Sequence, residues 1–251
     1  MEKLSSGYRI NNAGDDAAGL QLSENLEAQV RGDQKAEDNV QDAVNMLNVV
    51  DGAYQTITDQ IQRIRELGVE GANATYSTTQ KQAMIQEINQ LILEKNRVAD
   101  ATNFDGVPLM DGSINGFPSF PNQNPFMIQV GANANDVIDI SGAFGDAAAL
   151  AGFGGNLTFP QIIDKADTML QNLDTMRGNL GAYVDRLQGV EQNLSINVEN
   201  LQAADARIRD VDVAAESANL TQAKVLQQSA ALVLSQANQT PSLALQLLKG
   251  Q

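Results

Sequence analysis

The sequence predicts a mainly α-helical fold: a long antiparallel helical bundle or coiled coil, with a small β-hairpin region and a further helix at the carboxyl end. Aliphatic residues recur at alternating intervals of four and three along two long stretches, which is typical of helices packed in a coiled coil. Aromatic residues make up only 4% of the 251 residues, and there is no tryptophan. Glycine, proline and phenylalanine gather in one central stretch. Helical arms around a region of turns and short strands are therefore expected.

The first predicted helix covers residues 16–73 and would be roughly 85 Å long. A polar turn ends it, and Ser77 or Thr78 can cap a second helix that runs to about Ala101. A short turn between two long helices makes them antiparallel neighbours. The apolar stripe of the first helix is Ala36, Val40, Ala43, Leu47, Val50, Tyr54, Ile57, Ile61 and Ile64, and that of the second is Met84, Ile88, Leu91, Ile92 and Val98.

The central stretch, residues 103–159, differs in kind. It holds all seven phenylalanines, nine glycines and four prolines, with five acidic residues and no lysine or arginine. Apolar and polar residues alternate over 126–130 and again over 138–140, with turn residues between them, which predicts a β-hairpin. Val107 to Met110 can supply an extra strand.

A third helix is predicted to begin at Pro160, because proline is well placed in the first turn of a helix. Its apolar stripe slips in phase near Asn197. The stripe is Ile162, Ala166, Met169, Leu173, Met176, Leu180, Tyr183, Leu187, Val190 and Leu194. We expect this helix to be the packing partner of the first.

The last zone, residues 210–248, is predicted to be helical and carries no charge between Lys224 and Lys249. A lone helix this apolar and neutral is not stable in water, so it needs a partner. Pro241 should interrupt or kink it. The apolar residues that we expect to make the contacts are Val225, Leu226, Val233, Leu234, Leu247 and Leu248.

Composition excludes several classes of function. The formal net charge is -15, with only 16 lysines and arginines, which argues against a nucleic-acid partner. The chain has no cysteine and no histidine, so thiolate chemistry, Ser-His-Asp triads and the usual zinc sites are excluded. Asp15, Asp16, Asp210 and Asp212 are interpreted as helix-boundary residues and not as metal ligands. We expect no enzyme activity, no metal and no cofactor.

Membrane and secretory segments are also not expected. The uncharged run near the carboxyl end is interrupted by too many polar residues to span a bilayer. The amino-terminal residues lack the apolar core of a cleavable signal peptide.

Short motifs stand in a definite order along the chain. They are Leu-Ser-Ser-Gly-Tyr-Arg-Ile-Asn at 4–11, Asp-Asp-Ala-Ala-Gly at 15–19, Gln-Arg-Ile-Arg-Glu-Leu at 62–67, Asn-Phe-Asp-Gly at 103–106, Ala-Arg-Ile-Arg-Asp-Val-Asp-Val-Ala at 206–214, Leu-Gln-Gln at 226–228, Leu-Ser-Gln-Ala-Asn-Gln at 234–239 and Leu-Leu at 247–248. In order and spacing they resemble the two terminal signatures of bacterial flagellin. The resemblance covers nearly the whole chain except about 111–160.

The resemblance implies a structural subunit of the bacterial flagellar filament, which self-assembles through its terminal helices into a helical tube for motility. It implies that the two chain ends pair as a coiled coil in the filament core and that the β-hairpin region lies at the outer end. Secretion by the flagellar export apparatus would make the protein extracellular. The implied partners are other copies of the chain, an export chaperone, and cap and junction proteins.

The resemblance also suggests a division of the chain. Residues 1–15 would be an extended, spoke-like segment, 16–110 with 160–209 a helical rod, 103–159 a short variable β-rich region, and 210–251 the filament-core helix. Family members usually have about thirty further residues before the Leu-Ser-Ser-Gly motif, which form one strand of the core coiled coil. The last helix would then lack its amino-terminal partner, and we expect weak or no filament assembly from this chain.

Recognition by a Toll-like innate receptor is a further implication of the resemblance. By position, the residues that carry it over are Arg63, Leu67 and Glu87, although Gly68 departs from the more usual Ala or Ser. The alternative is that Leu67 simply packs and that Arg63 and Glu87 are solvated helix charges.

Two other functions stay open beside the filament subunit. A flagellin-like protein of the hook-filament junction shares the terminal helices, although the motif at 234–239 favours flagellin itself. A surface protein that binds a polysaccharide or host ligand would need an aromatic platform. The phenylalanines of the central stretch are the candidate for it, and they suit a small β core better.

Overall fold

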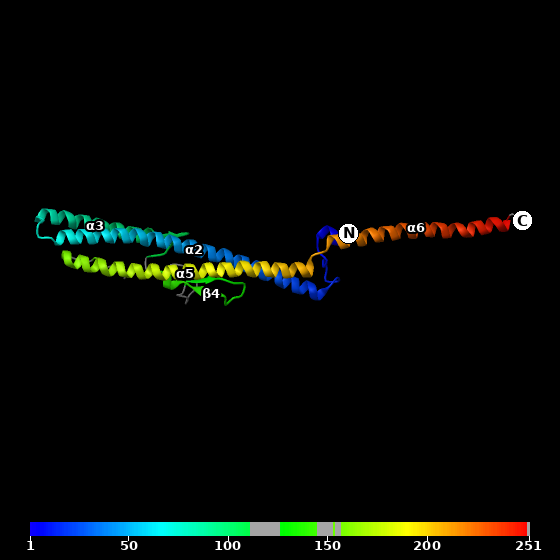
Figure 1. Cartoon of the computed structure of the whole chain (residues 1–251), viewed down its shortest axis with the longest axis horizontal. Coiled ribbons are helices and arrows are strands. Elements are labelled where there is room, and N and C mark those ends of the chain that lie inside the picture. Colours follow the sequence, from blue (N-terminus) through cyan, green and yellow to red (C-terminus); the bar gives the residue numbers. More distant parts are fainter. Residues whose placement is uncertain (111–125, 145–152, 154–156, 250–251) are drawn as a thin grey trace. The chain divides into compact units, whose positions relative to one another are not determined.

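The computed structural model describes residues 1–110, 126–144, 153 and 157–249, with residues 238–249 as backbone only. Figure 1 shows the elements along the chain. The helices are α1 (Glu2–Ser6), α2 (Ala17–Ala72), α3 (Thr78–Ala101), the 3-10 helix η2 (Ser141–Ala143), α5 (Phe159–Arg209) and α6 (Val213–Lys249). The strands are β1 (Asn103–Phe104), β2 (Val107–Pro108), β3 (Met127–Gln129) and β4 (Val137–Asp139). The predicted mainly α-helical fold with short antiparallel strands is confirmed.

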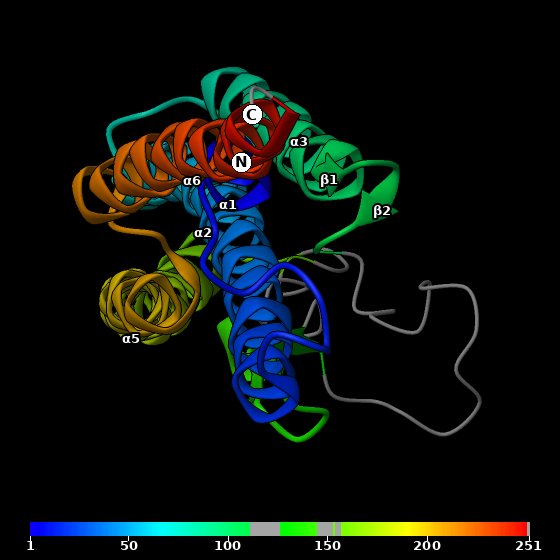
Figure 2. The same ribbon diagram turned by 90° about the vertical axis from the view of Figure 1, so that its right-hand side faces the viewer.

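The chain forms two compact units, residues 1–30 with 199–251 and residues 31–198. In the second unit, α2 lies between α3 and α5 (Figures 1 and 2). All nine residues of the predicted α2 stripe are buried. On α5, the buried members of the stripe are Ile162, Ala166, Met169, Leu173, Leu180, Leu187 and Leu194, with Met176, Tyr183 and Val190 packed partly buried against them. Each fully buried aliphatic side chain contributes about 1.5–3 kcal/mol, so this stripe is the main source of the unit's stability.

The turn between α2 and α3 is formed by local hydrogen bonds. Ser77 Oγ accepts from the backbone N–H of Gln80, and the Gln80 side chain accepts from the backbone N–H of Ser77. This reciprocal capping box makes Ser77, and not Thr78, the N-cap of α3. α5 begins beside the end of α2, where the ring of Phe159 packs over Gly71.

α3 contributes one buried residue that its predicted stripe omits. Lys95 is 4% exposed and follows Ile88 by seven positions, so it occupies a place that an apolar residue would ordinarily take. Burial lowers the pKa of the Lys95 ammonium, and the nearby Asp100 carboxylate opposes this effect.

Among the described residues between α3 and α5, the strands form two separate two-stranded sheets. β1 and β2 join through Asp105 and Gly106, both with positive φ (51° and 78°), which allows a tight turn. The extra strand predicted at 107–110 is therefore β2, paired with β1. The predicted hairpin is β3–β4, with Ile128 opposite Ile138.

The β3–β4 hairpin packs along the side of the helices in the second unit. Ile138 and Ile140 are buried in the cluster that contains the α2 stripe, and Asn39 Nδ2 on α2 donates to the Gln129 carbonyl at 3.3 Å. The hairpin turn comes so close to α2 that a Cβ at Gly32 would lie 2.7 Å from the Ala132 Cβ. The hairpin can therefore pack this closely against α2 because residue 32 has no side chain.

In the unit formed by residues 1–30 and 199–251, α5 ends at Arg209 and α6 begins at Val213. α1 lies against α6, and Tyr8 forms an antiparallel bridge with Asp210. α6 remains helical through Pro241, so the predicted interruption does not occur. A proline removes a single backbone donor, and α6 continues as a helix on both sides of Pro241.

Candidate functional site

The amino-terminal end of α6 is capped by Asp212. Its Oδ1 accepts from the backbone N–H groups of Ala214 at 2.9 Å and Ala215 at 3.1 Å, and Glu216 lies in the first turn. A carboxylate here satisfies free N–H groups and opposes the helix dipole. The cap fixes the residue at which α6 begins. The side chains that follow then share faces of the helix at the usual intervals of three and four residues.

The apolar side chains of α6 are exposed over the part whose side chains the structure describes. The exposed fractions are 55% for Val225, 61% for Leu226, 67% for Val233 and 63% for Leu234. Leu232, which the sequence prediction did not include, is 72% exposed, and it follows Val225 by seven positions on the same face. Leu247 and Leu248 lie in the segment described as backbone only. Exposed aliphatic residues in such a row are typical of an association surface.

No charge interrupts this surface, since the chain carries none between Lys224 and Lys249. Within the described residues, no helix combines the length and apolar character needed to cross a membrane.

The three residues of the predicted receptor motif are brought together at the α2–α3 hairpin. Arg63 Nη2 lies 2.8 Å and Arg63 Nε 3.0 Å from Glu87 Oε1, and Arg63 Nη1 lies 3.2 Å from Glu66 Oε2. These hydrogen bonds, that to Glu87 first, raise the pKa of Arg63. Arg63 and Glu87 are about half exposed, whereas Leu67 is 2% exposed and packs with Ile64, Ile88 and Ile162.

The carboxylates singled out in the sequence make contacts at helix boundaries. Asp16 Oδ1 accepts from the Gly19 N–H at 3.0 Å at the start of α2. Asp15 Oδ2 accepts from the backbone N–H groups of Asn11 and Asn12, which lower the pKa of the Asp15 carboxyl. In the described ranges, no three acidic side chains gather in an arrangement that could hold a metal ion.

The family model for the bacterial flagellin N-terminal helical region matches residues 1–115, and that for the bacterial flagellin C-terminal helical region matches residues 163–248. These ranges contain α1 to α3 and nearly all of α5 and α6.

Similar proteins match over almost the whole chain. Flagellin of Halalkalibacterium halodurans is 38% identical, over 99% of this chain and 90% of that protein. The flagellar filament 33 kDa core protein of Treponema phagedenis is 37% identical, and flagellin of Bacillus subtilis 36%, each over 99% of this chain and 91% of the relative. The crystal structure of Bacillus cereus flagellin has the same fold, with a TM-score of 0.52 at 24% identity over 62% of this chain and 88% of that one. The chain belongs to the bacterial flagellin family.

Proposed function

We infer that this protein is a structural subunit of the bacterial flagellar filament, which self-assembles through its helices for motility. The exposed apolar row on α6 carries this proposal together with the family. The stripes of α2 and α5 are already buried within one molecule, whereas the α6 row is not. Copies that join through different surfaces form an open helical assembly when the rotation between neighbours does not close into a ring.

The alternatives lack comparable support. The described phenylalanines do not form a ligand platform: Phe126 and Phe144 pack together with ring centroids 5.3 Å apart, and Phe104 and Phe153 pack against the same core. We also propose that the protein is not an enzyme, since the chain has neither histidine nor cysteine to act as base or nucleophile.

The proposal is tested by replacing the α6 row and measuring self-association. Leu226→Gln, Val233→Gln and Leu234→Gln are combined in one variant, and Leu93→Gln on α3, 60% exposed in the wild type, is the control. Sedimentation velocity over a wide concentration range should show association of the wild type and of the control but not of the triple variant. Electron microscopy then reports whether the assemblies are tubular. Equal association of the triple variant would contradict the proposal.

We further propose the division of labour that the sequence suggests. Residues 210–251 serve as the filament-core helix, 16–110 with 160–209 as the rod, 103–159 as the outer region, and 1–15 as the connecting segment. Electron cryomicroscopy of the assembled filament tests this division. A filament in which α6 faces the outer surface would exclude it.

The extracellular location and the remaining partners are proposed on the same basis. The flagellar export apparatus would deliver the chain, an export chaperone would cover the α6 row before assembly, and cap and junction proteins would meet it at the filament ends. An uncharged apolar helix needs such cover in water. Fractionation of the producing cells should place the protein in the flagella, and its retention inside the cells would count against this part.

Recognition by a Toll-like innate receptor is a second proposal. Arg63 and Glu87 form an exposed ion pair on neighbouring helices. The buried Leu67 would hold the two helices together beneath this pair. In a receptor reporter assay, Arg63→Ala and Glu87→Ala should each reduce the response. Arg97→Ala removes a different exposed ion pair, that between Arg97 and Glu94 on α3, and should not reduce the response. No response to the wild-type protein would end this proposal.

A further inference from the structure

The break between α5 and α6 is held by a segment from the other end of the chain. The Val211 N–H donates to the Gly7 carbonyl at 3.0 Å, and the Arg9 N–H donates to the Arg209 carbonyl at 2.6 Å. The Arg9 guanidinium adds a hydrogen bond to the Ile208 carbonyl at 2.6 Å. Residues 7–9 therefore run antiparallel to residues 208–211, on both sides of the point where the helix breaks.

Arg209 joins these two segments to a third element. Its guanidinium lies over the ring of Tyr8, with Cζ 4.4 Å from the ring centroid, which is within the range of a cation–π interaction. Its Nη1 lies 3.4 Å from Glu27 Oε2 on α2, and the Arg209 side chain is 22% exposed. One side chain thus contacts the amino-terminal segment and α2 from the last residue of α5.

The link between the two helices would otherwise be free to turn. Asp210, Val211 and Asp212 are not helical, and each contributes two soft backbone dihedrals. The bond that the Arg9 N–H donates to the Arg209 carbonyl and the bond that the Val211 N–H donates to the Gly7 carbonyl restrain the backbone on both sides of Asp210, and the cap made by Asp212 restrains the end of the link. Gly7 adopts φ 77° at the end of α1, which directs the chain into this pairing while α1 lies against α6.

We propose that Tyr8, Arg209 and Glu27, together with the paired segments 7–9 and 208–211, form a clasp that sets the direction in which α6 leaves α5. In this role Arg209 is a positioning residue, because the contacts of its side chain are to Tyr8 and Glu27. The assembly role of α6 rests on the proposed function, whereas the clasp itself is a property of one molecule. Its consequence for assembly is that each subunit presents α6 in one orientation.

The clasp is tested by measuring the spread of distances between α5 and α6. The chain has no cysteine, so cysteines introduced at Gln202 and Gln222, both exposed, accept a pair of spin labels without further changes. Pulsed electron resonance on the full chain should give one narrow distance distribution. Arg209→Ala and Tyr8→Leu should each increase the width of the distance distribution at least twofold. Tyr8→Phe, which keeps the aromatic ring, should have the same narrow distribution as the wild type.

The control is Arg207→Ala, which removes an exposed arginine two positions away and should leave the distribution narrow. Circular dichroism should show the same helix content in all variants, which separates loss of the clasp from unfolding. A narrow distribution in Arg209→Ala, or an equal broadening in Arg207→Ala, would overturn the proposal. Sedimentation of the unlabelled wild type reports on self-association separately, so failure of the filament proposal would be seen independently of the clasp.

Discussion

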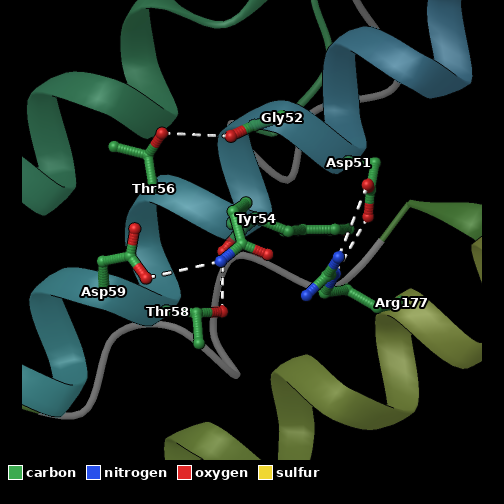
Figure 3. A network of polar contacts seen from close by, with 8 residues as sticks. Asp51, Gly52, Tyr54, Thr56, Thr58, Asp59 and Arg177 are labelled. Carbon is green, nitrogen blue, oxygen red and sulfur yellow. Dashed lines mark hydrogen bonds and ion pairs between the residues drawn. The ribbon is translucent and has the colours of Figure 1, made fainter.

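The guanidinium of Arg177 on α5 donates to the carboxylate of Asp51 on α2, with Nε 2.9 Å from Oδ1 and Nη2 3.5 Å from Oδ2. Figure 3 shows the pair beside Tyr54, which is 1% exposed. The hydrogen bond to Asp51 raises the pKa of Arg177. The apolar stripes repeat every seven residues, so by themselves they could pair in more than one register. A charged pair at one position favours the observed one.

Replacing Arg177 with Met should destabilise the protein by about 0.5–1 kcal/mol, because the pair is only partly buried and water screens it. The loss should shrink in high salt, since ions screen the attraction further. Urea unfolding at low and high salt measures both effects. Arg186→Met, at an exposed position of α5, is the control and should change stability little. A loss that does not depend on salt would contradict an ionic role for the Arg177–Asp51 pair.

Two glycines of α2 should respond in opposite directions to alanine. A Cβ at Gly71 would overlap the Phe159 ring, so Gly71→Ala should destabilise by about 1–3 kcal/mol. A Cβ at Gly52 meets nothing within 4 Å, so Gly52→Ala should stabilise the helix by about 1 kcal/mol. Thermal unfolding distinguishes the two. Equal effects would mean that the Phe159 ring moves aside without cost.

Lys95→Met should stabilise the protein by about 1 kcal/mol, because it removes a buried charge from an apolar row. The lowered pKa gives the change a pH dependence. Below that pKa the desolvation cost is fully present, and as the pH rises from it towards the ordinary value of 10.5 the ammonium loses its proton in the folded state. Wild-type stability therefore rises across this window, and the advantage of Met shrinks.

Stability measured from neutral to alkaline pH, as the difference between wild type and Lys95→Met, isolates this group from other titrations. Lys35→Met, at a side chain 71% exposed, should show neither the gain nor the pH trend. A constant advantage of Met at all pH values would show that Lys95 is not desolvated in solution.

Ser77→Ala should destabilise the α2–α3 hairpin by about 1 kcal/mol, since it removes the side-chain acceptor for the Gln80 N–H. Thr78→Ala should have a smaller effect, because Thr78 is the first helical residue and makes no cap. Hydrogen exchange of the first turn of α3 reports on the cap directly. Faster exchange in Thr78→Ala than in Ser77→Ala would reverse the assignment.

The helices, their ends and their buried faces follow from the sequence because they depend on near neighbours. A stripe such as Leu47, Tyr54 and Ile61 repeats at a helical period, and Ser77 and Pro160 stand at helix starts whatever surrounds them. The uncharged stretch after Lys224 likewise predicts the apolar character of α6.

What the sequence alone determined was thus the set of long helices and the side of each that is buried or left apolar, whereas the short α1 lies in a segment that the sequence predicted as extended. Tertiary structure alone decided the pairings across the chain: Arg177 with Asp51, Lys95 inside the α3 row, Phe159 on Gly71, and Arg209 between Tyr8 and Glu27. A charge on a helix has many positions that it could face. Only the register of the packed helices determines which partner it meets, and whether water reaches it.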